Sequence, residues 1–201
     1  MTSFARQPLS DFLASIASKT PTPGGGAVAS AVGALAAALA QMVVAYSVGK
    51  RSLAQHEPRL QDSVKVLERA RAMLLELADE DAGAYGAVNE LSKLHEGDPR
   101  RAALPAAMAA SVQVPLAVMA AAVDLLRHFE ELAPITNKQL RSDLAIAAVL
   151  ADATTRASRW NVAVNVAFLS DKATADASTK AAEGLLSESK RLCKIVESAC
   201  T

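Results

Sequence analysis

The chain of 201 residues has few cysteines, few aromatic residues and no net charge. Its 21 basic and 21 acidic side chains balance, so no long-range field favours nucleic acid or an anionic membrane as a partner. Aromatic residues make up only 3% of the chain, which argues against a surface that stacks on nucleic-acid bases. Cys193 and Cys200 would share a helix face but lie too far apart for a disulfide. Two unpaired thiols and the lack of a signal-peptide pattern predict a cytoplasmic location.

Clusters of cysteine and histidine with metal-ligand spacing are also missing, so we expect no metal site. The three histidines, His56, His95 and His128, are scattered beside charged residues, and we expect each at the surface. Strand-like alternation and repeats of fixed period are absent as well. What the sequence has is helical spacing of apolar residues. It predicts an all-α fold, with residues 1–201 forming a single domain of about five or six long helices, several of them kinked.

The expected helices follow from apolar spacing, capping residues and prolines. A short amphipathic helix is predicted from Ser10, as its N-cap, to Ser18. A helix of eight or nine turns begins at Glu57-Pro58, where proline suits the first turn. A third long helix is predicted from Asp98-Pro99 to about Leu132, with kinks or a break at Pro105 and Pro115. Two further helices are predicted, one from Lys138 to Leu169 and one from Thr174 to Ala199.

The most distinctive stretch is Thr20–Arg51, in which prolines and three glycines lead into a long uncharged run. Gly24, Gly25 and Gly26 permit backbone conformations and close approaches that other residues do not. The alanine-rich run that follows is long enough to span a membrane. However, its small residues gain little from lipid, Gln41 interrupts it, and no second comparable segment is apparent. We therefore predict a buried core helix and no membrane partner.

Two features of this half of the chain could carry chemistry. The backbone amides of Gly24–Gly26, at a helix N-terminus, could hold an anion or the polar edge of a ligand; a tight turn between helices is the structural alternative. Asp81 falls on the apolar stripe of its helix, where an unpaired acid costs free energy unless its pKa rises. Asp81 is therefore either a candidate acid or base, or one partner of a buried ion pair.

A third feature is the polar set between Asn137 and Asn165. Asn161 and Asn165 are four residues apart and share a helix face, and Asp143 lies on approximately the same face. Amides and a carboxylate along a mostly apolar helix indicate a hydrogen-bonding cleft. The alternative is that each amide binds the backbone of a neighbouring helix.

The segments PTPGGGAVAS, GALAAALAQMV, GK, DEDAGAY, VPL and TNKQLRSD…NVAVN occur in this order. Together they resemble the cyclodeaminase/cyclohydrolase family over about Leu9 to Leu192. This family includes the C-terminal domain of formiminotransferase-cyclodeaminase and stand-alone methenyltetrahydrofolate cyclohydrolases. The resemblance implies an all-helical homodimer that acts on a tetrahydrofolate substrate without a further cofactor.

The resemblance also implies roles for individual residues. Asp81, the second aspartate of the Asp-x-Asp-Ala motif, is implied to transfer protons, with Lys50 holding a pterin or carboxylate oxygen. The residues implied to bind substrate are Gly24, Gly25, Gly26, Asn137, Asp143, Asn161 and Asn165. The leading hypothesis is hydrolysis of 5,10-methenyltetrahydrofolate to 10-formyltetrahydrofolate, because no formiminotransferase domain accompanies the chain. The alternatives are a formiminotetrahydrofolate cyclodeaminase and a non-catalytic protein that binds a folate or a partner.

Several residues depart from the family pattern. Gly83 replaces a longer residue beside Asp81, and Arg159 and Trp160 replace small residues before Asn161-Val162. These departures leave the predicted fold intact but bear on substrate identity and on whether catalysis is retained. Whether Asp81 faces an open cleft or is sealed by an ion pair discriminates between an enzyme and a binding protein.

Overall fold

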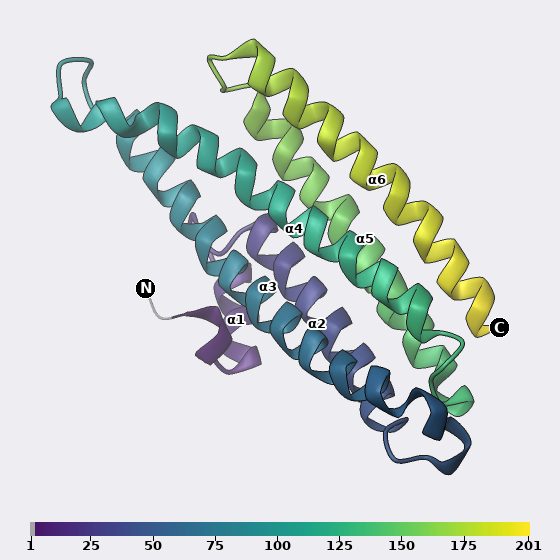
Figure 1. Ribbon diagram of the computed structural model, residues 1–201. Coiled ribbons are helices and arrows are strands. Elements are labelled where there is room, and N and C mark those ends of the chain that lie inside the picture. Colours follow the sequence, from purple (N-terminus) through teal and green to yellow (C-terminus); the bar gives the residue numbers. More distant parts are fainter. Residues whose placement is uncertain (1–2) are drawn as a thin grey trace.

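Helices account for all the regular structure in the computed structural model, which describes residues 3–201 (Figure 1). Its α-helices are α1 (Leu9–Ala17), α2 (Gly25–Ala45), α3 (Glu57–Ser92), α4 (Leu104–Leu132), α5 (Arg141–Val166) and α6 (Lys172–Cys200). Short 3-10 segments are η1 (Phe4–Arg6), η2 (Arg51–His56), η3 (Pro99–Ala103) and η4 (Lys138–Leu140). The all-α prediction and the number of long helices are therefore confirmed for the described part of the chain.

Most helix starts follow the expected capping chemistry. α2 begins after Gly24, and α3 carries Pro58 in its first turn. At η3 the Asp98 side chain accepts a hydrogen bond from the Arg100 N–H, as an N-cap should. The exception is α1, for which the predicted cap was wrong. Its cap position is Pro8, and Ser10 lies inside the first turn, where its hydroxyl donates to the Asp11 carboxylate.

The prolines of α4 do not break it. The α-helix starts at Leu104, later than predicted, because residues from Pro99 to Ala103 form a tighter 3-10 turn. Pro105 then occupies the first turn, where its missing N–H leaves no helical hydrogen bond unmade. Pro115 lies in the interior, and the helix continues through it to Leu132.

The core is formed where α2 packs between α3 and α5, with α4 contacting α3 and α5. Small residues allow this close packing: a Cβ added to Gly33 would lie 3.1 Å from Thr154 Cγ2 and 3.2 Å from Leu74 Cδ2. α2 is thus a buried core helix, as predicted. The expectation that no second segment is comparable was wrong, since Pro99–Leu132 is also long and apolar enough to span a membrane. Length and composition alone are weak evidence for a span.

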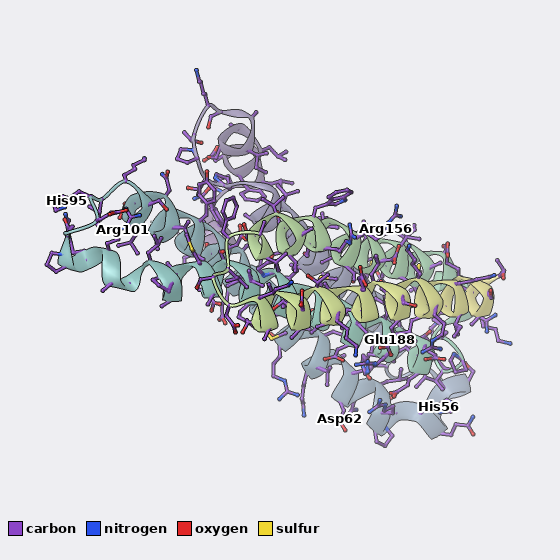
Figure 2. The ribbon with its side chains drawn as sticks, turned by 90° about the horizontal axis from the view of Figure 1, so that it is seen from above. His56, Asp62, His95, Arg101, Arg156 and Glu188 are labelled. Atoms are coloured by element: carbon purple, nitrogen blue, oxygen red, sulfur yellow. The ribbon has the colours of Figure 1, made fainter. Side chains whose placement is uncertain are left out.

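α2 and α5 run antiparallel, which gives the bundle two chemically different ends. At one end the N–H of Asn137 donates to Ser47 Oγ, at 2.9 Å, just beyond the C-terminus of α2. At the other end Gly25 lies against Asn161 of α5. Figure 2 shows His56 at the first end and the loop with His95 and Arg101 at the opposite end.

One histidine departs from its predicted surface position. The His128 side chain is only 11% exposed, because it lies on the inward side of α4 although its sequence neighbours are charged. Its Nδ1 is 4.0 Å from a carboxylate oxygen of Glu131, and its Nε2 is buried without a hydrogen-bond partner. His95 is exposed, as predicted, and His56 is of intermediate exposure.

Candidate active site

The Asp81 carboxyl group packs directly on the glycine-rich turn. A Cβ added to Gly26 would overlap all three atoms of the Asp81 carboxyl group, so any larger residue at this position would require the carboxyl group to move. The N–H of Ala27, in the first turn of α2, donates a hydrogen bond to the same carboxyl group. The turn and the acid, which the sequence singled out separately, therefore form one structural unit.

Burial raises the pKa of Asp81 above the ordinary aspartate value of 3.8, because desolvation disfavours the charged form. The Ala27 hydrogen bond opposes this shift and is the weaker effect. Among residues 3–201, no Lys, Arg or His forms an ion pair with Asp81. The alternative of a sealed, buried ion pair is therefore wrong, and Asp81 remains a candidate acid or base.

Asp81 opens into a cleft of about 380 Å³. The cleft lies between the start of α2, the middle of α3 and the facing parts of α4 and α5. Its lining residues are Pro21, Thr22, Gly24, Gly25, Gly26, Asp81, Tyr85, Val88, Met108, Ser111, Asn161, Val164, Asn165 and Phe168. An apolar wall with a few convergent polar groups is typical of small-molecule sites.

The two asparagines of α5 enter this cleft in different ways. A Cβ added to Gly25 would lie 3.6 Å from the side-chain oxygen of Asn161, so this amide faces the glycine-rich turn. The side-chain amide of Asn165 donates to the Ser111 carbonyl on α4, at 2.7 Å. For Asn165 the alternative of a bond to a neighbouring helix therefore holds, and this bond also fixes the wall of the cleft.

Sequence reasoning missed several residues of the cleft. Tyr85 lies one turn after Asp81 on the same stripe of α3, and its side chain is 52% exposed at the cleft. The stripe could have indicated Tyr85, since the same periodicity that selected Asp81 includes it. Met108 and Ser111 come from α4, and no sequence signal placed this part of α4 opposite Asp81.

Three of the predicted site residues lie at the other end of the bundle. Lys50 precedes η2, Asn137 precedes η4, and Asp143 is in the first turn of α5. α2 alone, at 21 residues, separates this end from Gly25 by about 30 Å. Within one copy of the chain, these residues cannot contact a ligand held at Asp81.

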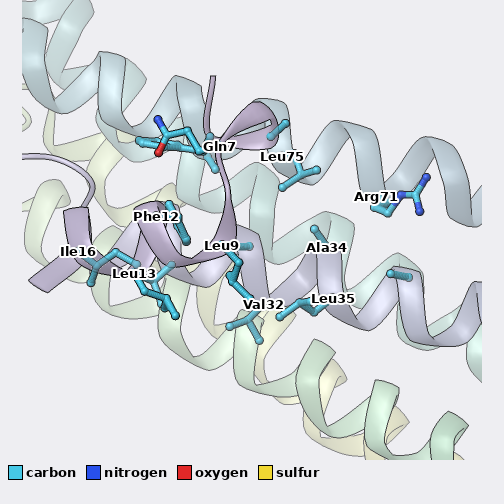
Figure 3. Close-up of a pocket in the computed structure, with 16 residues that line it drawn as sticks. Gln7, Leu9, Phe12, Leu13, Ile16, Val32, Ala34, Leu35, Arg71 and Leu75 are labelled. Atoms are coloured by element: carbon cyan, nitrogen blue, oxygen red, sulfur yellow. The ribbon is translucent and has the colours of Figure 1, made fainter. Parts of the chain in front are cut away.

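A second cavity, of about 360 Å³, lies between α1, α2 and α3 and differs sharply from the first. Figure 3 shows Leu9, Phe12 and Leu13 of α1 beside Val32 and Leu35 of α2. Arg71 is the one charged residue among those that line it. This cavity offers apolar surface but no acid–base pair. For the part of the chain that is described, no group of three or more His, Cys, Asp and Glu side chains could hold a metal ion.

Comparisons with known proteins show which family this chain is similar to. The family model described as formiminotransferase-cyclodeaminase matches residues 8–184. Methenyltetrahydrofolate cyclohydrolase of Methylorubrum extorquens is 33% identical over 186 residues, which cover 90% of this chain and 89% of that protein. Formimidoyltransferase-cyclodeaminase of Sus scrofa is 31% identical over 199 residues; the match covers 96% of this chain but only 37% of that longer protein.

A solved structure is also similar. The crystal structure of formiminotetrahydrofolate cyclodeaminase from Thermotoga maritima superposes with a TM-score of 0.90 at 33% identity. The superposition covers 97% of this chain and 96% of that one.

Proposed function

Because this chain belongs to the formiminotransferase-cyclodeaminase family of folate enzymes, we propose that it hydrolyses 5,10-methenyltetrahydrofolate to 10-formyltetrahydrofolate. The observation that carries the proposal is the Asp81 carboxyl group, which packs on Gly26, forms no ion pair with any of residues 3–201 and lines the cleft. A relative that matches along nearly its whole length carries the name of this cyclohydrolase.

The chemistry requires a positioned water, a base for its proton and an acid for the departing nitrogen. The methenyl carbon lies between two nitrogens that share a positive charge, so it is already electrophilic. Asp81 takes a proton from water as the new C–O bond forms. It then returns a proton to the ring nitrogen as the C–N bond breaks, and the new hydroxyl group loses its proton to solvent as the formyl C=O forms. A pKa raised by burial suits one carboxyl group to both steps.

The surroundings of Asp81 fit a flat, cationic substrate. Among residues 3–201 no cation forms an ion pair with this carboxylate, so a cationic ligand has no competing partner there. Asn161 offers an amide at the same level, while Tyr85 and Phe168 provide aromatic surface against which a planar ring can pack. The first turn of α2 lacks a capping side chain, so its backbone amides other than that of Ala27, which donates to Asp81, are available to a ligand oxygen.

A second candidate is closure of 5-formiminotetrahydrofolate with release of ammonia. It is favoured by the near-complete match to the Thermotoga maritima structure, which carries the name of that cyclodeaminase. Asp81 would then protonate the departing amine after attack by the second nitrogen of the folate. The cleft and its residues would be the same, and only the group that leaves the carbon differs.

Assays of both substrates on one preparation test the proposal. We expect purified protein to accelerate the loss of methenyltetrahydrofolate absorbance well above the uncatalysed rate at near-neutral pH. Ammonia release from the formimino substrate would instead support the second candidate. A protein that binds either folate without turnover would contradict both catalytic functions.

The proposal includes a cellular location and an assembly. Cys193 and Cys200 are unpaired, which suits a reducing compartment such as the cytoplasm. The active unit is proposed to be a homodimer, because α2 and α5 expose large apolar side chains that a monomer leaves in water.

A further inference from the structure

Two serine hydroxyl groups in the core have no hydrogen-bond partner. Ser30 on α2 is 0% exposed and Ser158 on α5 is 1% exposed. Each hydroxyl oxygen is buried and bonded to no group among residues 3–201. An unbonded buried hydroxyl group costs free energy, and buried polar side chains are therefore almost always bonded to protein or to ordered water. These two hydroxyl groups indicate a ligand in the core.

Other buried hydroxyl groups show what is unusual about this pair. A serine or threonine inside a helix can donate to the carbonyl oxygen four residues before it. Ser63, Thr154 and Thr155 do so, at 2.8 Å, 2.9 Å and 3.2 Å. Ser30 and Ser158 lie in the interiors of α2 and α5 and have the same option, but they do not take it. Their hydroxyl groups are thus free to bond something that lies between the helices.

The two serines occupy the same level of the bundle. Two close approaches fix the register of the antiparallel helices α2 and α5: Gly25 lies against Asn161, and Gly33 lies against Thr154. The serine of α2 is five residues after Gly25 and three before Gly33. The serine of α5 is three residues before Asn161 and four after Thr154. Along the bundle axis the two therefore lie within about one helical turn, or about 5 Å, of each other.

Both side chains also turn toward the same region of the core. Ser30 is three residues before Gly33, whose neighbours are side chains of α3 and α5. Ser158 is four residues after Thr154, the α5 side chain that lies against Gly33. Residues three or four apart share a helix face, so both serines face the region where α2, α3 and α5 meet.

This region lies directly beneath Asp81. The Asp81 carboxyl group occupies the position that a Cβ of Gly26 would take. Ser30 is four residues later, and Cβ atoms at that spacing are about 5–6 Å apart on a helix. One water molecule, with a hydrogen bond of about 2.8 Å on either side, spans this distance.

The chemistry of the region fits water as the ligand. A buried water molecule makes about two to four hydrogen bonds, and two hydroxyl groups with one carboxyl group supply three. A Ca²⁺ ion would need about six to eight oxygen ligands, more than these three groups provide. The small side chains of the serines and the glycines beside them leave little space for anything larger.

We propose that Ser30 and Ser158 bind a water molecule on the core side of the Asp81 carboxyl group and act through this water as positioning residues for Asp81. The water donates to the carboxylate and exchanges hydrogen bonds with the two hydroxyl groups. It lies beneath the carboxyl group, away from the cleft, so it is not the water that attacks the methenyl carbon. The water site does not depend on the proposed function, whereas its effect on catalysis rests on that function.

The ionisation of Asp81 can report on this water because few other groups influence it. Of the described residues that line the cleft, the titratable ones are Asp81 and Tyr85, both on α3. α2, α4 and α5 contribute no charged side chain to that lining. On α3 itself, the Asp79 carboxylate is bonded to the Phe4 N–H, and Glu80 is exposed.

Thermal unfolding tests the water site without any substrate. Ser30→Ala and Ser158→Ala should each lower Tm by about 2–4 °C, because each removes a hydrogen bond to the water. The double variant should lose clearly less than the sum, since both substitutions release the same water. The matched control is Ser63→Ala, whose hydroxyl group bonds its own helix, so its loss should add to that of Ser30→Ala. A higher Tm in either variant, as expected for hydroxyl groups that are truly unbonded, or additive losses would overturn the proposal.

A high-resolution crystal structure of the wild type locates the ligand. We expect a water within hydrogen-bond distance of Ser30 Oγ, Ser158 Oγ and a carboxyl oxygen of Asp81. A direct bond between the two hydroxyl groups, with no water beneath Asp81, would overturn the proposal.

The pH dependence of activity tests the positioning role. Loss of a hydrogen bond to the carboxylate raises the pKa of Asp81, so Ser30→Ala should move the acidic limb of kcat/KM to higher pH by about 0.5–1 unit. Ser63→Ala should leave the limb in place. NMR titration of the Asp81 carboxyl carbon measures the same shift without substrate. An unshifted titration in Ser30→Ala would overturn the positioning role, whereas a shifted titration in a protein inactive toward both folates would refute the proposed function alone.

Discussion

The two ends of the bundle differ in how far their charged and polar groups are paired. At the Lys50 end several of them are paired with one another: Arg59 with Glu131, the Gly49 N–H with Glu57, and the Asn137 N–H with Ser47. At the Asp81 end a partly buried acid has no ion-pair partner among residues 3–201 and faces an open cleft. Packing alone explains the first end. The second end carries an electrostatic cost that stability does not require, which is typical of a functional site.

The largest effect is expected from a substitution that disturbs the contact between Asp81 and Gly26. Gly26→Ala places a methyl group where the Asp81 carboxyl group lies, so the carboxyl group must move. We expect about a hundredfold loss of activity from misplacement and about 1–3 kcal/mol lower stability from overpacking. The control is Gly24→Ala, where the methyl group meets no atom within 4 Å. Equal losses in both variants would show that the contact is unimportant.

A smaller effect separates the two asparagines of the cleft. Asn165→Ala removes the hydrogen bond to the Ser111 carbonyl and should lower the free energy of unfolding by about 1 kcal/mol. Asn161→Ala removes an amide that faces the glycine-rich turn and should change stability by less than about 0.5 kcal/mol while raising KM. Urea unfolding and steady-state kinetics measure the two quantities. The reverse ranking in stability would contradict the assignment of Asn165 to the wall.

The cost of the unpaired acid should appear as a pH-dependent stability difference. Because burial raises the pKa of Asp81 in the folded state, the charged form destabilises the fold, and this cost is absent below pH 3.8 and grows as pH rises through the folded-state pKa. Asp81→Asn should therefore be more stable than the wild type at pH 7 and equal to it near pH 3. Thermal unfolding across this range measures the difference. A variant less stable than wild type at pH 7 would contradict the assignment.

His128 gives the corresponding test at the Lys50 end of the bundle, where the pH dependence of stability has the opposite sign. Burial lowers its pKa below the ordinary value of 6.5, so protonation opposes folding, and the stability it contributes above pH 6.5 is lost as pH falls through the folded-state pKa. His128→Leu should reduce the loss of stability between pH 7 and pH 5. His95→Gln, at an exposed histidine, is the control. Identical pH profiles of stability for His128→Leu and the wild type would contradict the claim that His128 causes part of this loss.

Much of the fold could be predicted because helix spacing, proline positions and caps are local signals. Asp81 could be predicted for the same reason, since an acid on an apolar stripe is visible within three turns of sequence. Its contact with Gly26 could not, because it joins residues 55 positions apart through the packing of α2 on α3.

Residues that share a helix face do not all belong to the site, because they can lie at opposite ends of the bundle. Asp143 and Asn161 lie on one face of α5, but they are 18 residues apart, which is about 27 Å along a helix. Lys50 was likewise placed beside Asp81 by resemblance, although they occupy opposite ends of the bundle. His128 was misplaced for a related reason: charged neighbours in sequence point to other sides of α4.

The most direct test of the central claim compares two aspartates on the same helix. Asp79 and Asp81 are two residues apart, but Asp79 accepts a hydrogen bond from the Phe4 N–H, at 2.9 Å, outside the cleft. The measurement is the rate of methenyltetrahydrofolate loss, corrected for uncatalysed hydrolysis, for the wild type, Asp81→Asn and Asp79→Asn. We expect Asp81→Asn to lower the rate by about 10²–10⁴-fold and Asp79→Asn to leave it within about twofold. An Asp81→Asn protein that keeps the wild-type rate would contradict the claim that this carboxyl group performs the chemistry.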